Sequence, residues 1–256
     1  MPIFVEKKPD KLISEDGTRI DGRKPDELRP IEIKVGVLER ADGSAYVKWG
    51  GNRILVAVYG PRAAHPRHQA IPHEALVRCR YDMAPFSPST DRKKPGPDRR
   101  SIELSTVIEE ALKPVIFKEM FGGTAIDIFV EVLRSDAGTR VAGITGASVA
   151  LADAGIPIRG LVTGCSVGKV GDFIVLDPGH EEDMWGDGDM PVAFFMETGE
   201  VTLLQADGQY TYDEFQRALK LAYEGCKQVY ELQKKAIIEK YEKLKLEGEI
   251  DEQENS

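Results

Sequence analysis

Long hydrophobic runs are missing from this sequence of 256 residues. No apolar stretch approaches the roughly 20 residues with which a helix crosses a bilayer, so we expect no membrane span. The opening residues, MPIFVEKK, lack the basic segment and apolar core of a secretory signal. Cysteine is scarce as well, and the three cysteines lie far apart without a CxxC pair. That pattern is typical of reduced, mostly buried thiols, and together these absences predict a cytoplasmic protein.

Several common motifs of enzyme chemistry are also absent. The sequence has no GxxxxGKS or GxxxxGKT phosphate loop, no GxGxxG after a strand, no HExxH and no GxSxG. The histidines His65, His68 and His73 have no metal-ligand spacing with a cysteine. These absences exclude the best-marked nucleotide-binding, zinc-protease and serine-hydrolase classes.

Acidic residues outnumber basic ones overall, 43 to 34, but the basic ones are concentrated in one stretch. The net charge is −9 and the isoelectric point is near 5.1, which by themselves argue against a nucleic-acid partner. Residues 62–100 nevertheless hold a cluster of basic side chains: Arg62, Arg67, Arg78, Arg80, Arg92, Lys93, Lys94, Arg99 and Arg100, with His65, His68 and His73. An enzyme can bind RNA along one basic path and still be acidic overall, although a solvated charged loop is the alternative interpretation.

Periodicity and turn signals predict one domain built from two similar halves. We expect an N-terminal arm over 1–28, a domain over 29–245 with halves at 29–155 and 156–245, and an acidic tail over 246–256. Strands are expected at 31–38, 44–49, 53–59, 75–81, 126–133, 161–167, 173–176, 192–196 and 201–206. Helices are expected from an N-cap at Asp98 to a stop near Pro114, over 140–154, and after a capping box at 211–214. Strands followed by helices twice over, joined by hairpins, predict an α+β fold with mixed sheets.

The string DAGTR at 136–140 lies where an expected strand turns into a helix of small residues. Gly138 permits close backbone approach, Thr139 has a hydroxyl to donate, and the helix start exposes unpaired N–H groups. Arg140 adds a charged fork that suits phosphate oxygens. The string therefore indicates an anion site, with an ordinary helix cap beside a surface arginine as the alternative.

Five carboxylates crowd into residues 181–189. Such a cluster must be solvated, paired with cations or bound to a metal, because like charges at short range disfavour ionisation. Asp183 and Asp189 flank a Trp-Gly pair, and Asp189 is expected just before a strand. Oxygen ligands of this kind suit Mg²⁺ or Mn²⁺. A solvated acidic loop is the alternative.

Two arginines, Arg99 and Arg100, open the helix expected after Asp98. Positive charge in a first turn opposes the helix dipole, which is unfavourable unless an anion or a carboxylate lies nearby. The pair therefore indicates either a bound anion or a salt bridge to Glu103.

Taken together, these strings resemble the ribonuclease PH superfamily. The strings that carry the resemblance are DGR at 21–23, ELRP at 27–30, ADGS at 41–44, MAPFS at 83–87, PGPDRRSIE at 95–103, DAGTR at 136–140, EDMWG at 182–186 and DMP at 189–191. These strings occur in the same order as in the family, and the resemblance extends from about residue 12 to residue 245. Within the superfamily the chain looks most similar to the catalytic subunit of the archaeal exosome.

This resemblance implies a ribonuclease PH-like fold (ribosomal protein S5 domain 2-like). It also implies a hexameric ring of three catalytic and three related inactive subunits, with RNA-binding cap proteins on one face. Single-stranded RNA would thread the pore, and inorganic phosphate would attack the terminal 3′ linkage to release nucleoside diphosphates. The reverse reaction would add 3′ tails.

Site residues follow from the resemblance as well. Gly138, Thr139 and Arg140 would bind phosphate, and Arg99 and Arg100 would hold the RNA backbone. Asp183 and Asp189 would act as general acid and as ligands of Mg²⁺ or Mn²⁺, in an order that the sequence leaves open. Arg67 and His68 would contact RNA at the pore constriction.

Two residues depart from the family pattern. Thr139 stands where the family often has Ser, which keeps the hydroxyl, and Gly188 before Asp189 is expected to loosen the backbone there. Two other functions compete with the catalytic exosome subunit. One is a non-catalytic RNA-binding ring scaffold, which should lack the carboxylate pair or the basic phosphate loop, and the other is a homohexameric ribonuclease PH that trims tRNA 3′ ends.

Overall fold

The computed structural model describes residues 8–9, 11–89 and 93–254. Arg92, one member of the basic cluster, lies outside these residues. The elements in chain order are β1 (Ile31–Val35), β2 (Gly43–Trp49), β3 (Asn52–Ala63), η1 (Arg67–Gln69), β4 (Leu76–Met83), α1 (Arg99–Leu112), η2 (Lys113–Val115), η3 (Lys118–Phe121), β5 (Thr124–Arg134), α2 (Thr139–Asp153), β6 (Val162–Val170), β7 (Phe173–Leu176), α3 (His180–Trp185), β8 (Gly188–Phe195), β9 (Glu200–Leu204), β10 (Asp207–Gly208) and α4 (Tyr212–Glu254). No helix in the described residues is long and apolar enough to span a membrane.

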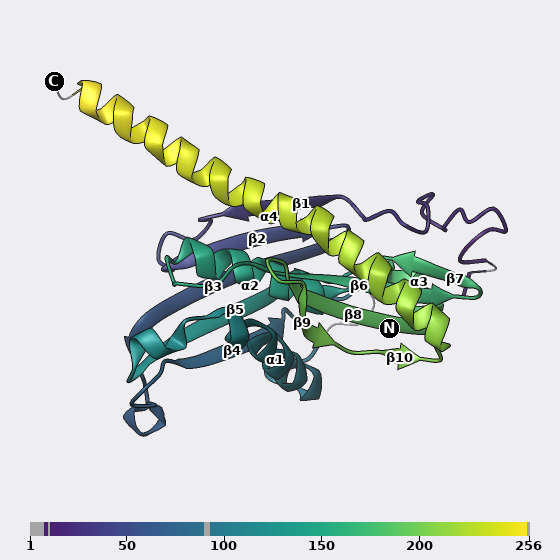
Figure 1. The fold of residues 1–256 in the computed structure, drawn as a ribbon, viewed down its shortest axis with the longest axis horizontal. Helices are drawn as coiled ribbons and strands as arrows, with labels where there is room; N and C mark the ends of the chain where they lie inside the picture. The colour runs from purple at the N-terminus through teal and green to yellow at the C-terminus, as the bar shows by residue number, and fades with distance from the viewer. Residues whose placement is uncertain (1–7, 10, 90–92, 255–256) are drawn as a thin grey trace.

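Two five-stranded sheets carry the fold (Figure 1). The first has the order β1-β2-β3-β5-β4, and all its neighbours are antiparallel except the parallel pair β4 and β5. The second has the order β10-β8-β6-β7, with β9 paired to β8. The expected meander of the first three strands is therefore confirmed, and mixed sheets with packed helices confirm the α+β class.

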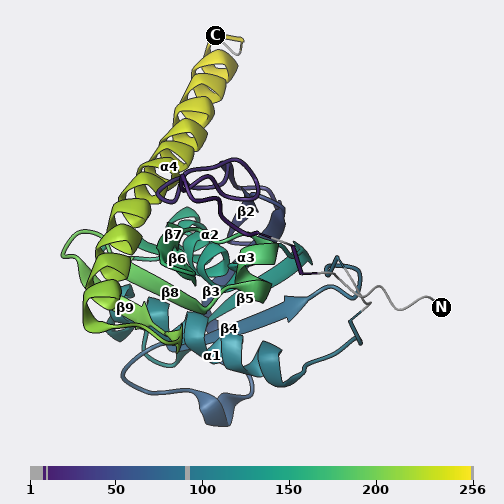
Figure 2. The ribbon, with the colours of Figure 1, turned by 90° about the vertical axis from the view of Figure 1, so that its right-hand side faces the viewer.

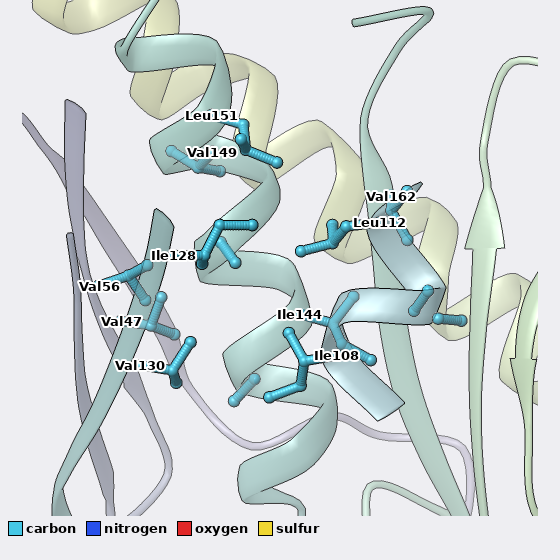
Figure 3. Close-up of a cluster of buried hydrophobic side chains, with 14 of the residues drawn as sticks. Val47, Val56, Ile108, Leu112, Ile128, Val130, Ile144, Val149, Leu151 and Val162 are labelled. Atoms are coloured by element: carbon cyan, nitrogen blue, oxygen red, sulfur yellow. The ribbon is translucent and has the colours of Figure 1, made fainter. Parts of the chain in front are cut away.

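Helix α2 packs against strands of both sheets, so the core is continuous through it (Figure 3). Its small residues are what allow this close packing. A Cβ at Gly146 would meet Val47 Cγ2 at 2.8 Å and Val56 Cγ2 at 3.1 Å. A larger residue at this position would push the helix away from the first sheet.

The helix ends follow local sequence signals. Asp98 caps α1 by accepting a 2.7 Å hydrogen bond from Ser101 N, and the helix ends at Leu112, two residues before Pro114. Thr211 and Glu214 form the expected capping box of α4, in which Thr211 N donates to Glu214 Oε2 at 2.8 Å. Helix α4 continues through Glu254, so its last turns include the acidic residues that follow Glu247.

The carboxylate segment differs from the expectation in two ways. Residues 180–185 form the short helix α3 rather than a loop, and β8 begins at Gly188, so Asp189 lies inside the strand instead of before it. Gly188 does not loosen the backbone, because it pairs with Lys169 on one side and Gly208 on the other. A Cβ there would meet Asp207 O and Tyr210 Oη at 2.8 Å. Tight packing against Asp207 and Tyr210 is therefore what excludes a side chain at this position.

Candidate active site

The first turns of α1 and α2 meet α3 and the start of β8 around a cleft of about 570 Å³ (Figure 2 shows α3 above α1). The residues that line it are Asp98, Arg99, Arg100, Glu103, Leu104, Arg140, Asp183 and Asp189. The structure thus brings together both arginine groups and both carboxylates singled out in the sequence. Arg67 and His68 are not among them. They are exposed on η1, in the connection between β3 and β4.

The turn before α2 is held in an unusual backbone conformation. Ala137 and Gly138 have φ angles of 50° and 66°, in the left-handed region where a non-glycine residue is disfavoured. Asn52 fixes this turn from the first sheet: its Nδ2 donates to Ala137 O at 2.6 Å, and its Oδ1 accepts from Asp136 N at 2.7 Å. Arg29 donates to both the carbonyl and the carboxylate of Asp136.

Arg29 is in turn held by a buried carboxylate. Asp177 accepts hydrogen bonds from Arg29 Nε at 3.0 Å, from Arg29 Nη2 at 2.7 Å and from Trp49 Nε1 at 2.9 Å. These contacts with Arg29 lower the pKa of Asp177 even though burial opposes the shift. Sequence reasoning gave Arg29 and Asn52 no role. The ELRP string, which is part of the family resemblance, could have indicated a role for Arg29. For Asn52 the sequence shows only that it lies in an expected turn.

The start of α2 offers free donors to an anion. Ala142 N bonds to Gly138 O at 3.2 Å, and in the described residues the N–H groups of Thr139, Arg140 and Val141 have no acceptor. Arg140 reaches into the cleft, where Gln205 Oε1 accepts a hydrogen bond from its Nη1. Gln205, which sequence reasoning missed, is anchored by its own N–H to Pro191 O at 3.1 Å. Helix donors and a held guanidinium together suit a phosphate group.

The protein disfavours the ionised form of both aspartates of the cleft. Burial and then the neighbouring charge of Asp183 raise the pKa of Asp189 to about 6. Its Oδ1 is buried and has no hydrogen-bond partner. Asp183 is exposed at the cleft, yet the surrounding protein raises its pKa as well, against the opposing charges of Arg100, His180 and Arg140. A pair with raised pKa values can hold a proton or a cation near neutral pH.

Helix α3, which carries Asp183, is fixed by a buried ion pair. Arg19 Nε donates to Glu182 Oε1 at 2.7 Å, and Nη2 donates to Glu182 Oε2. The side chains are 0% and 1% exposed. Arg19 also donates to Leu176 O at 2.7 Å and to Asp177 O at 3.0 Å. The arm before β1 therefore positions a carboxylate of the cleft, which the sequence did not indicate.

Arg99 and Arg100 are exposed at the first turn of α1, and in the described part of the chain neither forms a salt bridge with Glu103. Both arginines line the cleft, where the charge of Arg100 acts on the carboxylate of Asp183. Asp98 is the carboxylate closest to them in sequence. Hydrogen bonds from the backbone and side chain of Ser101 lower its pKa to about 2, so it stays ionised.

The aspartate pair also bears on metal binding. No group of three or more His, Cys, Asp or Glu side chains that could hold a metal ion occurs in the described residues. Mg²⁺ is commonly held by one or two carboxylates together with waters and substrate phosphates. The unpaired Oδ1 of Asp189 beside Asp183 fits that pattern.

We expect Asp189→Asn to stabilise the isolated chain at neutral pH. A folded-state pKa near 6, above the unfolded value near 4, means that the ionised carboxylate costs folding free energy at high pH. That cost is absent below the unfolded pKa and grows as the pH rises through 6. Removing the charge should therefore gain about 2 kcal/mol at pH 7.5, after allowance for solvent screening.

Urea unfolding in phosphate-free buffer with a chelator measures this gain, which should shrink as the pH falls from 7.5 to 4.5. The matched control is Asp172→Asn, at an exposed carboxylate in the turn between β6 and β7. An equal gain in both variants, or a gain independent of pH, would contradict the burial of charge at Asp189.

Comparison with known protein families matches both halves of the chain. Residues 27–157 match domain 1 and residues 160–225 match domain 2 of the 3′ exoribonuclease family, RNase PH. The exosome complex component Rrp41 of Methanopyrus kandleri is 60% identical over 237 residues, which cover 93% of this chain and 99% of that protein. Rrp41 of Pyrococcus furiosus is 59% identical over 243 residues, which cover 95% of this chain and 97% of that protein.

A crystal structure of rice (Oryza sativa) Rrp46 superposes with a TM-score of 0.77 and 19% identity, over 86% of this chain and 99% of that one. At this identity the likeness concerns the fold, and it confirms the expected ribonuclease PH-like architecture. With both halves matched in order and relatives at about 60% identity along nearly its whole length, the chain belongs to the RNase PH family of 3′ exoribonucleases.

Proposed function

We propose that this chain is the phosphorolytic 3′→5′ exoribonuclease subunit of an exosome ring. The observation that carries the proposal is one cleft that combines Arg99, Arg100 and Arg140 with the aspartate pair. Family membership supplies the 3′ exoribonuclease activity, and the cleft supplies groups for phosphate, RNA backbone and proton.

In this reaction an oxygen of inorganic phosphate attacks the phosphorus of the terminal 3′ linkage. A new P–O bond forms, the bond to the 3′ oxygen of the preceding nucleotide breaks, and a nucleoside diphosphate leaves. Two anionic groups must approach each other, so Arg140 and the N–H groups at the start of α2 hold the phosphate, while Arg99 and Arg100 hold the RNA backbone. At high diphosphate concentration the same steps in reverse add 3′ tails.

The departing 3′ oxygen needs a proton. Asp189, whose pKa is raised to about 6, and Asp183 are the acids within the cleft that can supply it. Asp183 and Asp189 would also hold a Mg²⁺ or Mn²⁺ ion, which when bound stabilises negative charge on the leaving oxygen. The division of these two roles between the carboxylates is open in the proposal.

The proposal extends to partners. The relatives at about 60% identity are named exosome complex components, which supports assembly with related ring subunits. We further propose that the ring includes a non-catalytic subunit, carries RNA-binding cap proteins, acts on single-stranded RNA and works in the cytoplasm. Arg67 and His68, exposed on η1 and away from the cleft, are proposed to contact RNA at the pore constriction rather than at the reacting bond.

Product analysis tests the function. We expect the chain, assembled with its ring partner, to shorten poly(A) only when phosphate is present and to release adenosine diphosphate. Chromatography of products in phosphate and in a non-nucleophilic buffer measures this. Release of adenosine monophosphate at an unchanged rate without phosphate would show hydrolysis and refute the proposal.

A further inference from the structure

A buried tyrosine on β4 reaches the start of α2. Tyr81 lies on β4, and its side chain is 1% exposed. Its Oη lies 2.8 Å from Oγ1 of Thr139, the first residue of α2, which is itself 4% exposed. Its backbone N–H donates to Ser105 Oγ on α1 at 2.9 Å. Tyr81 is therefore tied to α1 through its backbone and to α2 through its hydroxyl.

The Tyr81 hydroxyl is influenced by two cationic side chains of the cleft. Burial raises the pKa of Tyr81, whereas the hydrogen bond with Thr139 and the charges of Arg100 and Arg140 act in the opposite direction. Both arginines line the cleft. Because its pKa lies above the ordinary value, the phenol keeps its proton at neutral pH and can serve as a donor.

Either hydroxyl can donate in this bond, and the direction decides what the Thr139 hydroxyl offers to an anion. Each hydroxyl has one hydrogen, and in the described residues Tyr81 Oη and Thr139 Oγ1 have no other partner. When Tyr81 donates, Thr139 Oγ1 is the acceptor and its own hydrogen is free to point elsewhere. When Thr139 donates instead, its hydrogen is used up and an anion at the helix start loses one donor.

We infer that Tyr81 is a positioning residue for phosphate binding: by donating to Thr139 Oγ1 it directs the Thr139 hydroxyl hydrogen toward the attacking phosphate. The inference rests on the proposed function, since it assigns a partner to the phosphate loop of that site. Strand β4 thus contacts the start of α2, next to the turn at 136–138 that Asn52 and Arg29 hold by hydrogen bonds.

The test is Tyr81→Phe, which removes the hydroxyl and keeps the ring. We expect KM for phosphate to rise roughly three- to tenfold, as the loss of one oriented donor implies, with kcat changed less than twofold. Calorimetric titration of the RNA-free ring with inorganic phosphate should show the same loss of affinity. Tyr46→Phe, at a half-buried tyrosine of β2 that does not line the cleft, is the control and should change neither.

A double-mutant cycle separates this role from a structural one. Thr139→Val removes the hydroxyl at nearly constant shape, and in that background Tyr81→Phe should raise the phosphate KM no further. A similar rise in both backgrounds, or unchanged phosphate affinity in Tyr81→Phe, would overturn the inference. The titration measures phosphate binding without RNA turnover. A negative result there would overturn the role of Tyr81, whereas only the product analysis can overturn the proposed function.

Discussion

Asp183→Ala is expected to abolish phosphate-dependent decay of poly(A) while the ring still assembles. The side chain lies exposed in the cleft with Arg100 and Arg140, on a short helix that the neighbouring Glu182 anchors to Arg19. A positioned acid or charge-stabilising group typically contributes a factor of about 10² to 10⁴ in rate. We therefore expect kcat to fall at least about a hundredfold, measured as diphosphate release from the reconstituted ring.

Glu181→Ala is the matched control for this variant. Glu181 is an exposed carboxylate on the same short helix and does not line the cleft. Its removal should leave the rate within twofold of the unmodified chain. Normal diphosphate release from Asp183→Ala in an assembled ring would remove Asp183 from the mechanism.

Arg19→Met should produce the largest loss of stability among these substitutions. It leaves the Glu182 carboxylate, 1% exposed, without its main cation, and it removes donors to two buried carbonyl groups. Breaking a buried pair from one side typically costs about 3–5 kcal/mol. Urea unfolding of the isolated chain should show a loss of that size, and activity should fall with it because α3 positions Asp183.

The double variant Arg19→Met with Glu182→Gln identifies the cause of that loss. If an uncompensated buried charge dominates, neutralising Glu182 should restore part of the stability. Lys11→Met, which removes an exposed pair with Glu15, should change the free energy of unfolding by less than about 1 kcal/mol. A loss in Arg19→Met as small as in Lys11→Met would contradict the anchoring of α3 by the N-terminal arm.

Local sequence signals correctly predicted the helix ends that depend on neighbouring residues. Asp98, Pro114 and the Thr211–Glu214 box mark the ends of α1 and the start of α4 in the structure because caps and proline act on backbone groups within a turn. Helix α3 was missed because its six residues have no apolar periodicity, and it is fixed by Arg19 from a distant part of the chain. Asp189 was misplaced before its strand because the pairing of Gly188 with Lys169 and Gly208 is not visible locally.

The sequence by itself determined the α+β class, the order of most strands and helices, and the strings that identify the family and mark Gly138, Arg140, Asp183 and Asp189. Only the tertiary structure decided that Arg140, Asp183 and Asp189 share one cleft with Arg99 and Arg100, while Arg67 and His68 do not line it. It alone placed Tyr81 against Thr139 and raised the pKa of Asp189 to about 6. The physical reason is that caps and periodicity depend on neighbours along the chain, whereas burial, charge coupling and hydrogen-bond direction depend on groups that only folding brings together.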